Sequence, residues 1–594
     1  MVTTAGIVLG LLAYGGHTDR DQQGMWGTRS RVVCGRAARS ATTFFCRGPR
    51  CHRSMFSAAT AIPCTGKSYS LQGCRQLSSA APRPSGVRRG ADAGAAAGRL
   101  AREIAQVLQS KGTQLVLHFD VNKTLIMVDP AGRKTQSQVL NSVLSEICWG
   151  QVEQSGSDQA SAWRWDGHST PAQRSLPPST EPPWRRRKSD KDKGVIPVDP
   201  DPVSYSDFLH QEFGDAEGKD NLRMKRIRDA KKGSFTEDGQ PGVGLRAEFL
   251  KLEQALALPE AVAKSPLTKR AGLADRQSYY IIPSFFRCLI ALKEAGTDFG
   301  VVFRTFGDDV AKVSREYNAF CEGNHPLLPG PKMDGSDGRG DYRIHLDQAE
   351  GSRTRNTIGA FFRDEKGVAL VMGTRDNPKD RRELRSIEEK GHSVYRSIAD
   401  IHDAICERVL SAPLRGFSPV DQVTSASPNS ASPAAPTSEL ASVQTNCVAE
   451  KGSRNVPGRC LALRDFYPFW RENLEAATAG KLLPVDLSKS PKVWSIMFDD
   501  NIGREDSSLG AHIVDIRAVA SGQPVPFDTA LERHIVRAEP FLAIDLGQGD
   551  AGAASASDEN FFLTNILKRL APERARRYSA REDGGIGSAC NPQP

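Results

Sequence analysis

The residues Leu115–Thr124 place polar side chains at the end of an apolar run. The stretch reads LVLHFDVNKT, so Asp120 and Asn122 follow the apolar residues directly. Strands buried on both faces of a parallel sheet read as continuous runs of Val, Ile and Leu, and open α/β sheets bind ligands at the carboxyl ends of their strands. The stretch therefore predicts a buried strand that delivers a carboxylate and an amide to a binding site.

Two further apolar runs end in polar residues of complementary kinds. The run FGVVFRT ends at Arg304 and Thr305. The run VWSIMFDDN ends at Asp499, Asp500 and Asn501. If the three strands are neighbours in a parallel sheet, carboxylates and a hydroxyl meet at one edge, and the carboxylates repel one another unless a cation lies between them. Mg²⁺ suits such a set because it binds one or two carboxylates, waters and a substrate phosphate.

Helix and strand signals alternate along the chain that must position these residues. Apolar residues at helical spacing predict helices, and apolar or alternating runs predict strands. The alternation favours an α/β fold with a mainly parallel sheet. The expected helices span 100–110, 135–149, 245–258, 279–296, 310–320, 383–410 and 463–478, the expected strands span 115–120, 299–303, 493–498 and 513–516, and a β-hairpin is expected over 357–372.

The three strand ends, taken in order, resemble the motifs of the haloacid dehalogenase superfamily. The first motif of that family, D-x-D-x-T after an apolar strand, is matched by Asp120–Leu125, which reads DVNKTL. The second, a Ser or Thr at a strand end behind a helix of the type lLkaLkeaG, is matched by Phe285–Thr305. The fourth, an acidic pair after a strand, is matched by Asp499 and Asp500. The resemblance covers the segments near 112–150, 278–322 and 460–520 and implies a Rossmann-like core.

The resemblance also implies a role for each of these residues. Asp120 would be the nucleophile that attacks a phosphoryl group and forms an aspartyl-phosphate. Thr305 would hydrogen-bond the phosphoryl oxygen of a small phosphorylated substrate. Mg²⁺ would be held by Asp120, by the backbone carbonyl of Asn122, and by Asp499 or Asp500.

A lysine in the third motif of the family neutralises the nucleophile and the phosphate. Lys481 is the preferred candidate, because it follows a predicted helix and precedes the third of the strands described above. Lys489 and Lys492 are the alternatives.

Two departures separate this chain from the phosphatases of the family. Those enzymes carry Asp at the position of Asn122, where it protonates the leaving group and then deprotonates water. Asn cannot titrate, and general acid–base help of this kind is worth about 10²–10⁴-fold in rate. Replacing Asn122 with Asp is therefore expected to raise any activity. The family also often places an Asp four residues after the metal-binding Asp, a position taken here by Arg504, with Glu505 and Asp506 displaced.

Two functions compete on these residues. The first is a Mg²⁺-dependent phosphohydrolase or phosphotransferase that acts through Asp120. The second is a binding or regulatory protein that keeps Mg²⁺ and phosphate recognition without turnover, which Asn122 favours. Nucleic-acid binding would rest on basic tracts such as 185–188 and 223–232 alone, and such tracts are usually solvated surface. We therefore expect no nucleic-acid partner, and the sequence leaves the oligomeric state open.

Composition and the family resemblance together divide the chain into segments. Tracts rich in Pro, Ser, Ala and charge are typical of disorder, and the family places a cap over its active site between the first and second motifs. The expected segments are a targeting or disordered extension over 1–95, core segments over 96–150, 278–322 and 459–545, a disordered insertion over 151–203, a helical cap-like insertion over 204–277, a second insertion with a hairpin and helices over 323–411, a disordered linker over 412–458, and a tail with a short helix over 546–594.

The net charge of +9 is concentrated near the amino terminus. No Asp or Glu occurs from Gln22 to Ala91, whereas twelve Arg or Lys residues do. An Arg-, Ser- and Ala-rich stretch without acids is typical of an organelle transit peptide, and Arg75–Ser78 resembles a mitochondrial processing site. We expect a mitochondrial protein. A plastid peptide has a similar composition, and a true start at Met25 or Met55 would favour the cytoplasm.

Several isolated features have ordinary structural explanations. Asp308 and Asp309 are expected to cap the helix over 310–320, and 129–132 (DPAG) is expected to form a turn. The twelve cysteines include no C-x-x-C pair, so neither a disulfide framework nor a zinc site is expected. Outside the amino-terminal extension no segment is a transmembrane candidate, and the apolar run over 5–14 is too short to span a bilayer.

Overall fold

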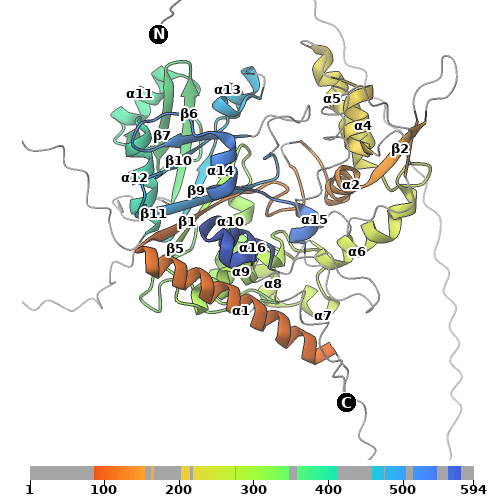
Figure 1. Ribbon diagram of the computed structural model, residues 1–594, viewed down its shortest axis with the longest axis horizontal. Coiled ribbons are helices and arrows are strands. Elements are labelled where there is room, and N and C mark those ends of the chain that lie inside the picture. The colour runs from red at the N-terminus through yellow and green to blue at the C-terminus, as the bar shows by residue number, and fades with distance from the viewer. Residues whose placement is uncertain are drawn as a thin grey trace, which may run out of the picture. The chain divides into compact units, whose positions relative to one another are not determined.

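Eight strands form the central sheet, in the order β13-β11-β1-β5-β9-β6-β7-β8 (Figure 1). Six of them are parallel, whereas β7 and β8 pair in the antiparallel sense. The strands span Ile535–Arg537 (β13), Val493–Asp499 (β11), Gln114–Asp120 (β1), Phe299–Thr305 (β5), Cys460–Arg464 (β9), Ile358–Asp364 (β6), Gly367–Met372 (β7) and Val394–Tyr395 (β8). The expected α/β fold with a mainly parallel sheet is confirmed.

The computed structural model describes twelve ranges of the chain, all within the unit Arg83–Pro594. Residues 1–85 of the extension expected over 1–95, the body of the insertion over 151–203, residues 412–457 of the expected linker and the displaced acids Glu505 and Asp506 lie outside these ranges. The described ranges are 86–130, 132–153, 162–165, 203–214, 219–274, 276–328, 330–346, 357–410, 458–473, 475–502, 513–544 and 560–576.

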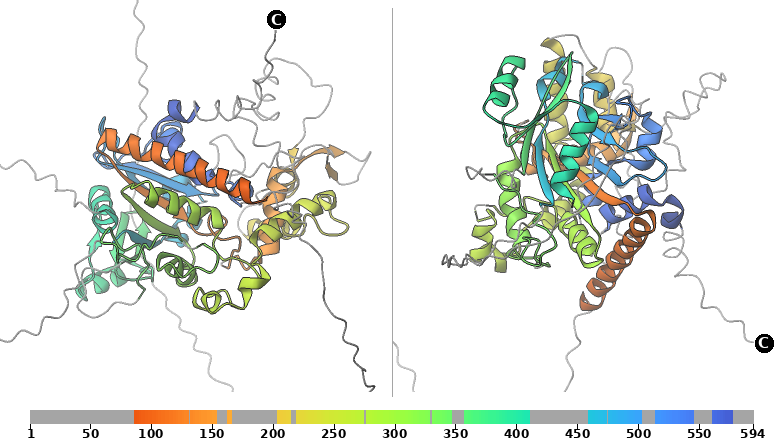
Figure 2. Two further views of the ribbon diagram at one scale, coloured as in Figure 1. Left: turned by 90° about the horizontal axis from the view of Figure 1, so that it is seen from below. Right: turned by 90° about the vertical axis from the view of Figure 1, so that its left-hand side faces the viewer.

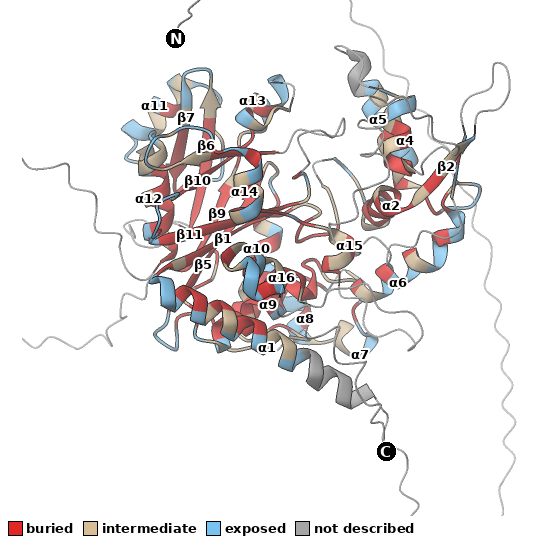
Figure 3. Ribbon diagram, in the orientation of Figure 1, coloured by how far each residue is buried: buried red, intermediate tan, exposed pale blue. Residues whose placement is uncertain are grey.

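Helices cover both faces of the sheet because successive side chains of a strand point to opposite faces. In β1, Leu117 and Phe119 share an apolar cluster with α1 (Gly86–Lys111), α9 (Pro283–Glu294) and α16 (Phe561–Leu570). Figure 2 shows α1 lying along this face of the sheet. Val116 points the other way, into a cluster with α12 (Ile398–Val409). The strands are consequently buried along most of their length (Figure 3).

A small antiparallel sheet follows the first core segment. Its strands are β2 (Trp149–Glu153), β3 (Ala162–Trp165) and β4 (Val203–Ser204). Trp163, Tyr205 and Phe235 pack ring against ring inside this part of the chain. The helices α2 (Gln136–Ile147) and α4 (Tyr205–Glu212) contact this sheet, and α5 (Lys219–Gly233) and α6 (Arg246–Leu256) pack against α2. The short helices α7 (Glu260–Ala263) and α8 (Pro266–Arg270) follow along the chain and lie nearer to α9 (Figure 1).

A separate two-stranded parallel sheet pairs β10 (Lys481–Val485) with β12 (Val514–Ala518). Among the described strands, neither β10 nor β12 pairs with a strand of the central sheet. The remaining helices are α10 (Val310–Cys321), α11 (Arg381–Glu389), α13 (Tyr467–Glu472), α14 (Phe527–Arg533) and α15 (Pro540–Ala543). None of the helices in the described ranges is long and apolar enough to cross a membrane.

Four expected helices differ from the structure. The helix predicted over 100–110 begins earlier, at Gly86. The helix predicted over 463–478 is wrong at its start, because the run Cys460–Arg464 is a strand hydrogen-bonded to both β5 and β6; within the predicted span the described helical segments are α13 and the start of a 3-10 turn, Ala477–Ala479. The helix predicted over 279–296 begins at Pro283, since the residue before a proline avoids the α region. The helix predicted over 383–410 is interrupted at Gly391, whose φ of +91° ends α11.

Candidate functional site

The carboxyl ends of β1, β5 and β11 meet at one edge of the central sheet. β1 lies between the other two strands, and its residue Asp120 pairs with Arg304 of β5. On the opposite side Phe119 pairs with Phe498, which places Asp499 next to Asp120. The three strand ends that the sequence predicts to be neighbours are therefore neighbours.

Lys481 connects the ends of β1 and β11 from the separate sheet. Its Nζ donates to Asp120 Oδ1 and lies 2.7 Å from Asp499 Oδ2, and its side chain is 1% exposed. Burial tends to lower the pKa of Lys481, but the charges of Asp120 and Asp499 outweigh burial and hold this pKa above its usual value. The structure thus brings Lys481, the preferred of the three candidate lysines, against the predicted nucleophile.

Asp120, Asp499 and Asp500 form a buried acidic group that could hold a metal ion. One carboxylate oxygen from each lies within 4.8 Å of the others. Burial, followed by the charges of Asp499 and Asp500, raises the pKa of Asp120 well above its ordinary value even though Lys481 opposes the shift. Burial likewise raises the pKa of Asp500 to about 6. Lys481 contacts two of the three carboxylates and Lys123 lies beside the third, so negative charge remains, and a hard divalent cation would neutralise it.

The turn after β1 is tied directly to the end of β11. The backbone N–H of Asp500 donates to Thr124 Oγ1 at 3.1 Å, and Lys123 Nζ lies 3.7 Å from Asp500 Oδ2. Lys123 adopts a left-handed backbone with φ of +59°, which turns the chain within three residues of Asp120. The role of the Asn122 backbone carbonyl as a metal ligand stays a prediction.

The side chain of Asn122 is held by two partners from the β5 end. Its Nδ2 donates to Asp309 Oδ2 at 3.2 Å, and its Oδ1 accepts from Thr305 Oγ1 at 3.3 Å. The Thr305 hydroxyl in turn accepts from the backbone N–H of Gly307 at 2.9 Å. A Cβ on Gly307 would lie 2.6 Å from Asp309 Oδ2, so a larger residue there would displace the Asp309 carboxylate.

Asp309 is the site residue whose position the sequence does not predict. It occupies the N-cap position of α10, but its side chain accepts no capping hydrogen bond from that fully described helix, so the predicted cap is wrong. The carboxylate faces Asn122 instead, and burial raises its pKa. The available signal is its place on the loop directly behind Thr305, at the edge where ligands bind in such sheets.

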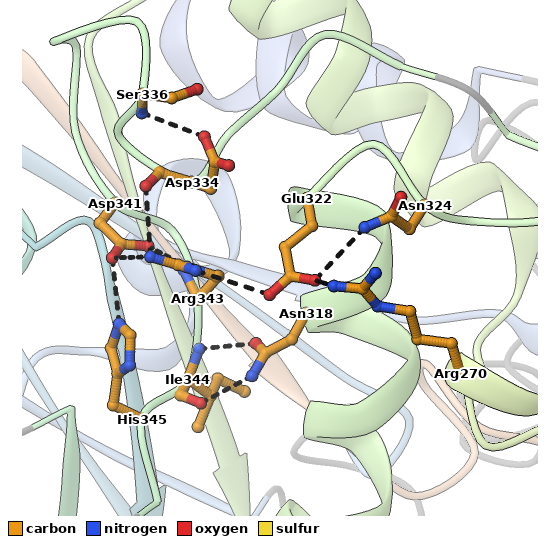
Figure 4. Close-up of polar contacts among 10 residues, drawn as sticks. All are labelled: Arg270, Asn318, Glu322, Asn324, Asp334, Ser336, Asp341, Arg343, Ile344 and His345. Carbon is orange, nitrogen blue, oxygen red and sulfur yellow. Dashed lines mark hydrogen bonds and ion pairs between the residues drawn. The ribbon is translucent and has the colours of Figure 1, made fainter. Parts of the chain in front are cut away.

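A second polar cluster, shown in Figure 4, lies beyond α10 and fastens the segment that follows that helix. Arg343 contacts both Asp341 and Glu322, and Asn318 exchanges two hydrogen bonds with the backbone of Ile344. Its carboxylates Asp341 and Glu322 are paired with Arg343, and His345 Nε2 lies 3.0 Å from Asp341 Oδ2. The cluster is therefore structural rather than a candidate metal site.

Comparison with models of known protein families, with curated proteins and with solved structures finds no match for this chain. The argument for function accordingly rests on the residues themselves and on their geometry.

Proposed function

We propose that this chain is a Mg²⁺-dependent phosphohydrolase or phosphotransferase of the haloacid dehalogenase type, with Asp120 as its nucleophile. The observation that carries the proposal is the buried contact of Lys481 with both Asp120 and Asp499. It joins a carboxylate, a cation and a second carboxylate at the edge of the sheet where Thr305 also lies. The residue types and their order along the chain match the motifs of that family.

The residues of the site divide the reaction among them. Asp120 attacks phosphorus, the bond from phosphorus to the leaving oxygen breaks, and that oxygen takes its proton from solvent water. The aspartyl-phosphate formed on the carboxylate is then attacked by water or by an acceptor hydroxyl, which releases the phosphate or transfers it and frees Asp120. Lys481 offsets the charge of the nucleophile and of the arriving phosphate. Thr305 turns its hydroxyl from Asn122 to a phosphoryl oxygen. Mg²⁺, when held by Asp120, Asp499 and Asp500, supplies charge neutralisation and fixes the phosphoryl oxygens for in-line attack.

Turnover is expected to be slow because Asn122 cannot exchange a proton with the leaving group or with water. Loss of that help lowers the rate by about 10²–10⁴-fold. The same residue supports the second candidate, a protein that binds Mg²⁺ and a phosphorylated molecule and hydrolyses little of it. Both functions use the same acidic group.

Beryllium fluoride with Mg²⁺, a mimic of an aspartyl-phosphate, tests the proposal in the full-length protein. We expect a stable adduct on the wild type, slow phosphate release from a generic phosphomonoester, and loss of both in Asp120→Asn. Asp376→Asn is the matched control, because this carboxylate is 95% exposed and pairs with Arg464 rather than with a residue of the acidic group. An adduct without phosphate release would favour the binding protein, and the absence of both would refute the proposal.

A further inference from the structure

The lysine of the site sits on a strand that does not belong to the central sheet. Lys481 opens β10, and β10 pairs with β12 alone. Its partners Asp120 and Asp499 belong to β1 and β11 of the central sheet. A small displacement between the two sheets would therefore separate the cation from the nucleophile. Contacts that fix β10 against the central sheet consequently set the position of Lys481 Nζ.

Arg304 makes one such contact from β5. Its Nη1 donates to the backbone carbonyl of Leu482 at 2.9 Å, directly after Lys481. The other two guanidinium nitrogens form a fork on Asp465, with Nε 3.0 Å from Oδ2 and Nη2 2.5 Å from Oδ1. The side chains of Arg304 and Asp465 are 0% and 3% exposed. A buried two-pronged pair of this kind has fixed geometry, so the third donor is held rigidly toward β10.

Arg363 makes a similar contact from β6. Its Nη1 donates to the carbonyl of Gly480, directly before Lys481, at 2.6 Å. Its Nη2 donates to the carbonyl of Thr478 at 2.6 Å and also contacts Asp515 of β12. The carbonyls of Gly480 and Leu482, the residues before and after Lys481, are thus each hydrogen-bonded by an arginine that projects from the central sheet.

We propose that Arg304 and Arg363 are positioning residues that hold Lys481 against Asp120. The inference rests on the proposed function, since it assigns the arginines to the same phosphoryl site. Neither arginine is placed against the phosphoryl group; both act through the backbone of β10. Lysine cannot replace them, because one ammonium group does not reproduce the separate planar donors with which Arg304 reaches Asp465 and Leu482 and Arg363 reaches Gly480, Thr478 and Asp515.

Arg363→Lys is the principal test, since the 10% exposed side chain keeps its charge opposite Asp515. Arg381→Lys is the matched control, because Arg381 is also paired with a carboxylate, that of Asp364, but contacts no carbonyl of β10. We expect Arg363→Lys to weaken the binding of beryllium fluoride with Mg²⁺ by about tenfold, the usual effect of losing one charge-assisted hydrogen bond. Arg381→Lys should leave binding unchanged.

A double-mutant cycle separates positioning from general support of the fold. If Arg363 acts through Lys481, then Arg363→Lys has no further effect on binding in a Lys481→Met background. An equal tenfold loss in that background would overturn the proposal. So would unchanged binding in the single variant.

Chemical labelling of lysine amines gives a readout that requires no ligand. Lys481 and Lys293 are both buried in the wild type, with side chains 1% and 7% exposed. In Arg363→Lys we expect acetylation of Lys481, measured by mass spectrometry, to accelerate at least tenfold while that of Lys293 stays unchanged. Equal acceleration at both would indicate loosening of the whole fold and overturn the proposal. If the wild type binds no beryllium fluoride but Lys481 is labelled faster in Arg363→Lys than in the wild type, the proposed function is refuted and the positioning of Lys481 stands.

Discussion

Replacing Asn122 with Asp restores the residue that the family's phosphatases carry, but the structure predicts that this change alone is harmful. The Nδ2 of Asn122 donates to Asp309 Oδ2 at 3.2 Å. An aspartate there would place two carboxylates against each other and remove the donor between them. Asp309 is buried, and burial already raises its pKa.

The size of the effect follows from that distance. Two unit charges 3.2 Å apart at an effective dielectric constant of about 20 repel by roughly 5 kcal/mol. Protonating one carboxyl of ordinary pKa costs about 4 kcal/mol at pH 7 and about 1.4 kcal/mol at pH 5. Protonating one carboxyl costs less than the repulsion between two carboxylates, so the folded variant binds an extra proton. We expect Asn122→Asp to lose about 4 kcal/mol of unfolding free energy at pH 7 and only about 1.4 kcal/mol at pH 5.

The matched rescue is Asn122→Asp combined with Asp309→Asn. This pair reverses the direction of the hydrogen bond and leaves one ionised carboxylate at position 122. We expect it to recover most of the stability at pH 7 and to release phosphate faster than the wild type, whereas Asn122→Asp alone stays slow because its carboxyl shares a proton with Asp309. Urea unfolding at both pH values and phosphate release measure the two effects. A single variant as stable as the wild type at pH 7 would refute the reasoning.

Lys481→Met should leave Asp120 and Asp499 buried without their shared lysine, which should lower the free energy of unfolding by about 3–5 kcal/mol. Urea unfolding in the presence of a chelator measures this loss, and added Mg²⁺ should recover part of it. Mg²⁺ at a hundred times its dissociation constant should raise the unfolding free energy by about 2.7 kcal/mol, and a thermal-shift titration should show no gain in Asp499→Asn. Burial tends to raise the pKa of Asp341, but hydrogen bonds, that from His345 foremost, hold it below its ordinary value. Its stabilisation is therefore present above about pH 4 and lost as the pH falls further. Asp341→Asn should weaken the acid dependence of unfolding, and an identical acid limb would contradict this.

The sequence predicts the strands of the site because each strand is a continuous apolar run with a polar end. β1, β5 and β11 are buried on both faces, so each appears in the sequence as a continuous run of apolar residues. The helix expected over 463–478 fails for the opposite reason. The short run Cys460–Arg464 has no local feature that distinguishes a strand from a helix, and its pairing with β5 and β6 decides the outcome.

The sequence by itself determined which carboxylates and which hydroxyl stand at strand ends, and that a cation must join them. Only the tertiary structure decided which of the three candidate lysines meets Asp120 and which side chain Asn122 faces. Lys481 lies 361 residues from Asp120 along the chain and reaches it from a separate sheet. Asp309 meets Asn122 across 187 residues. The periodicity of a sequence indicates which residues share a face of one helix or strand. The contacts of Lys481 with Asp120 and of Asp309 with Asn122 depend instead on how separate sheets and loops pack against one another.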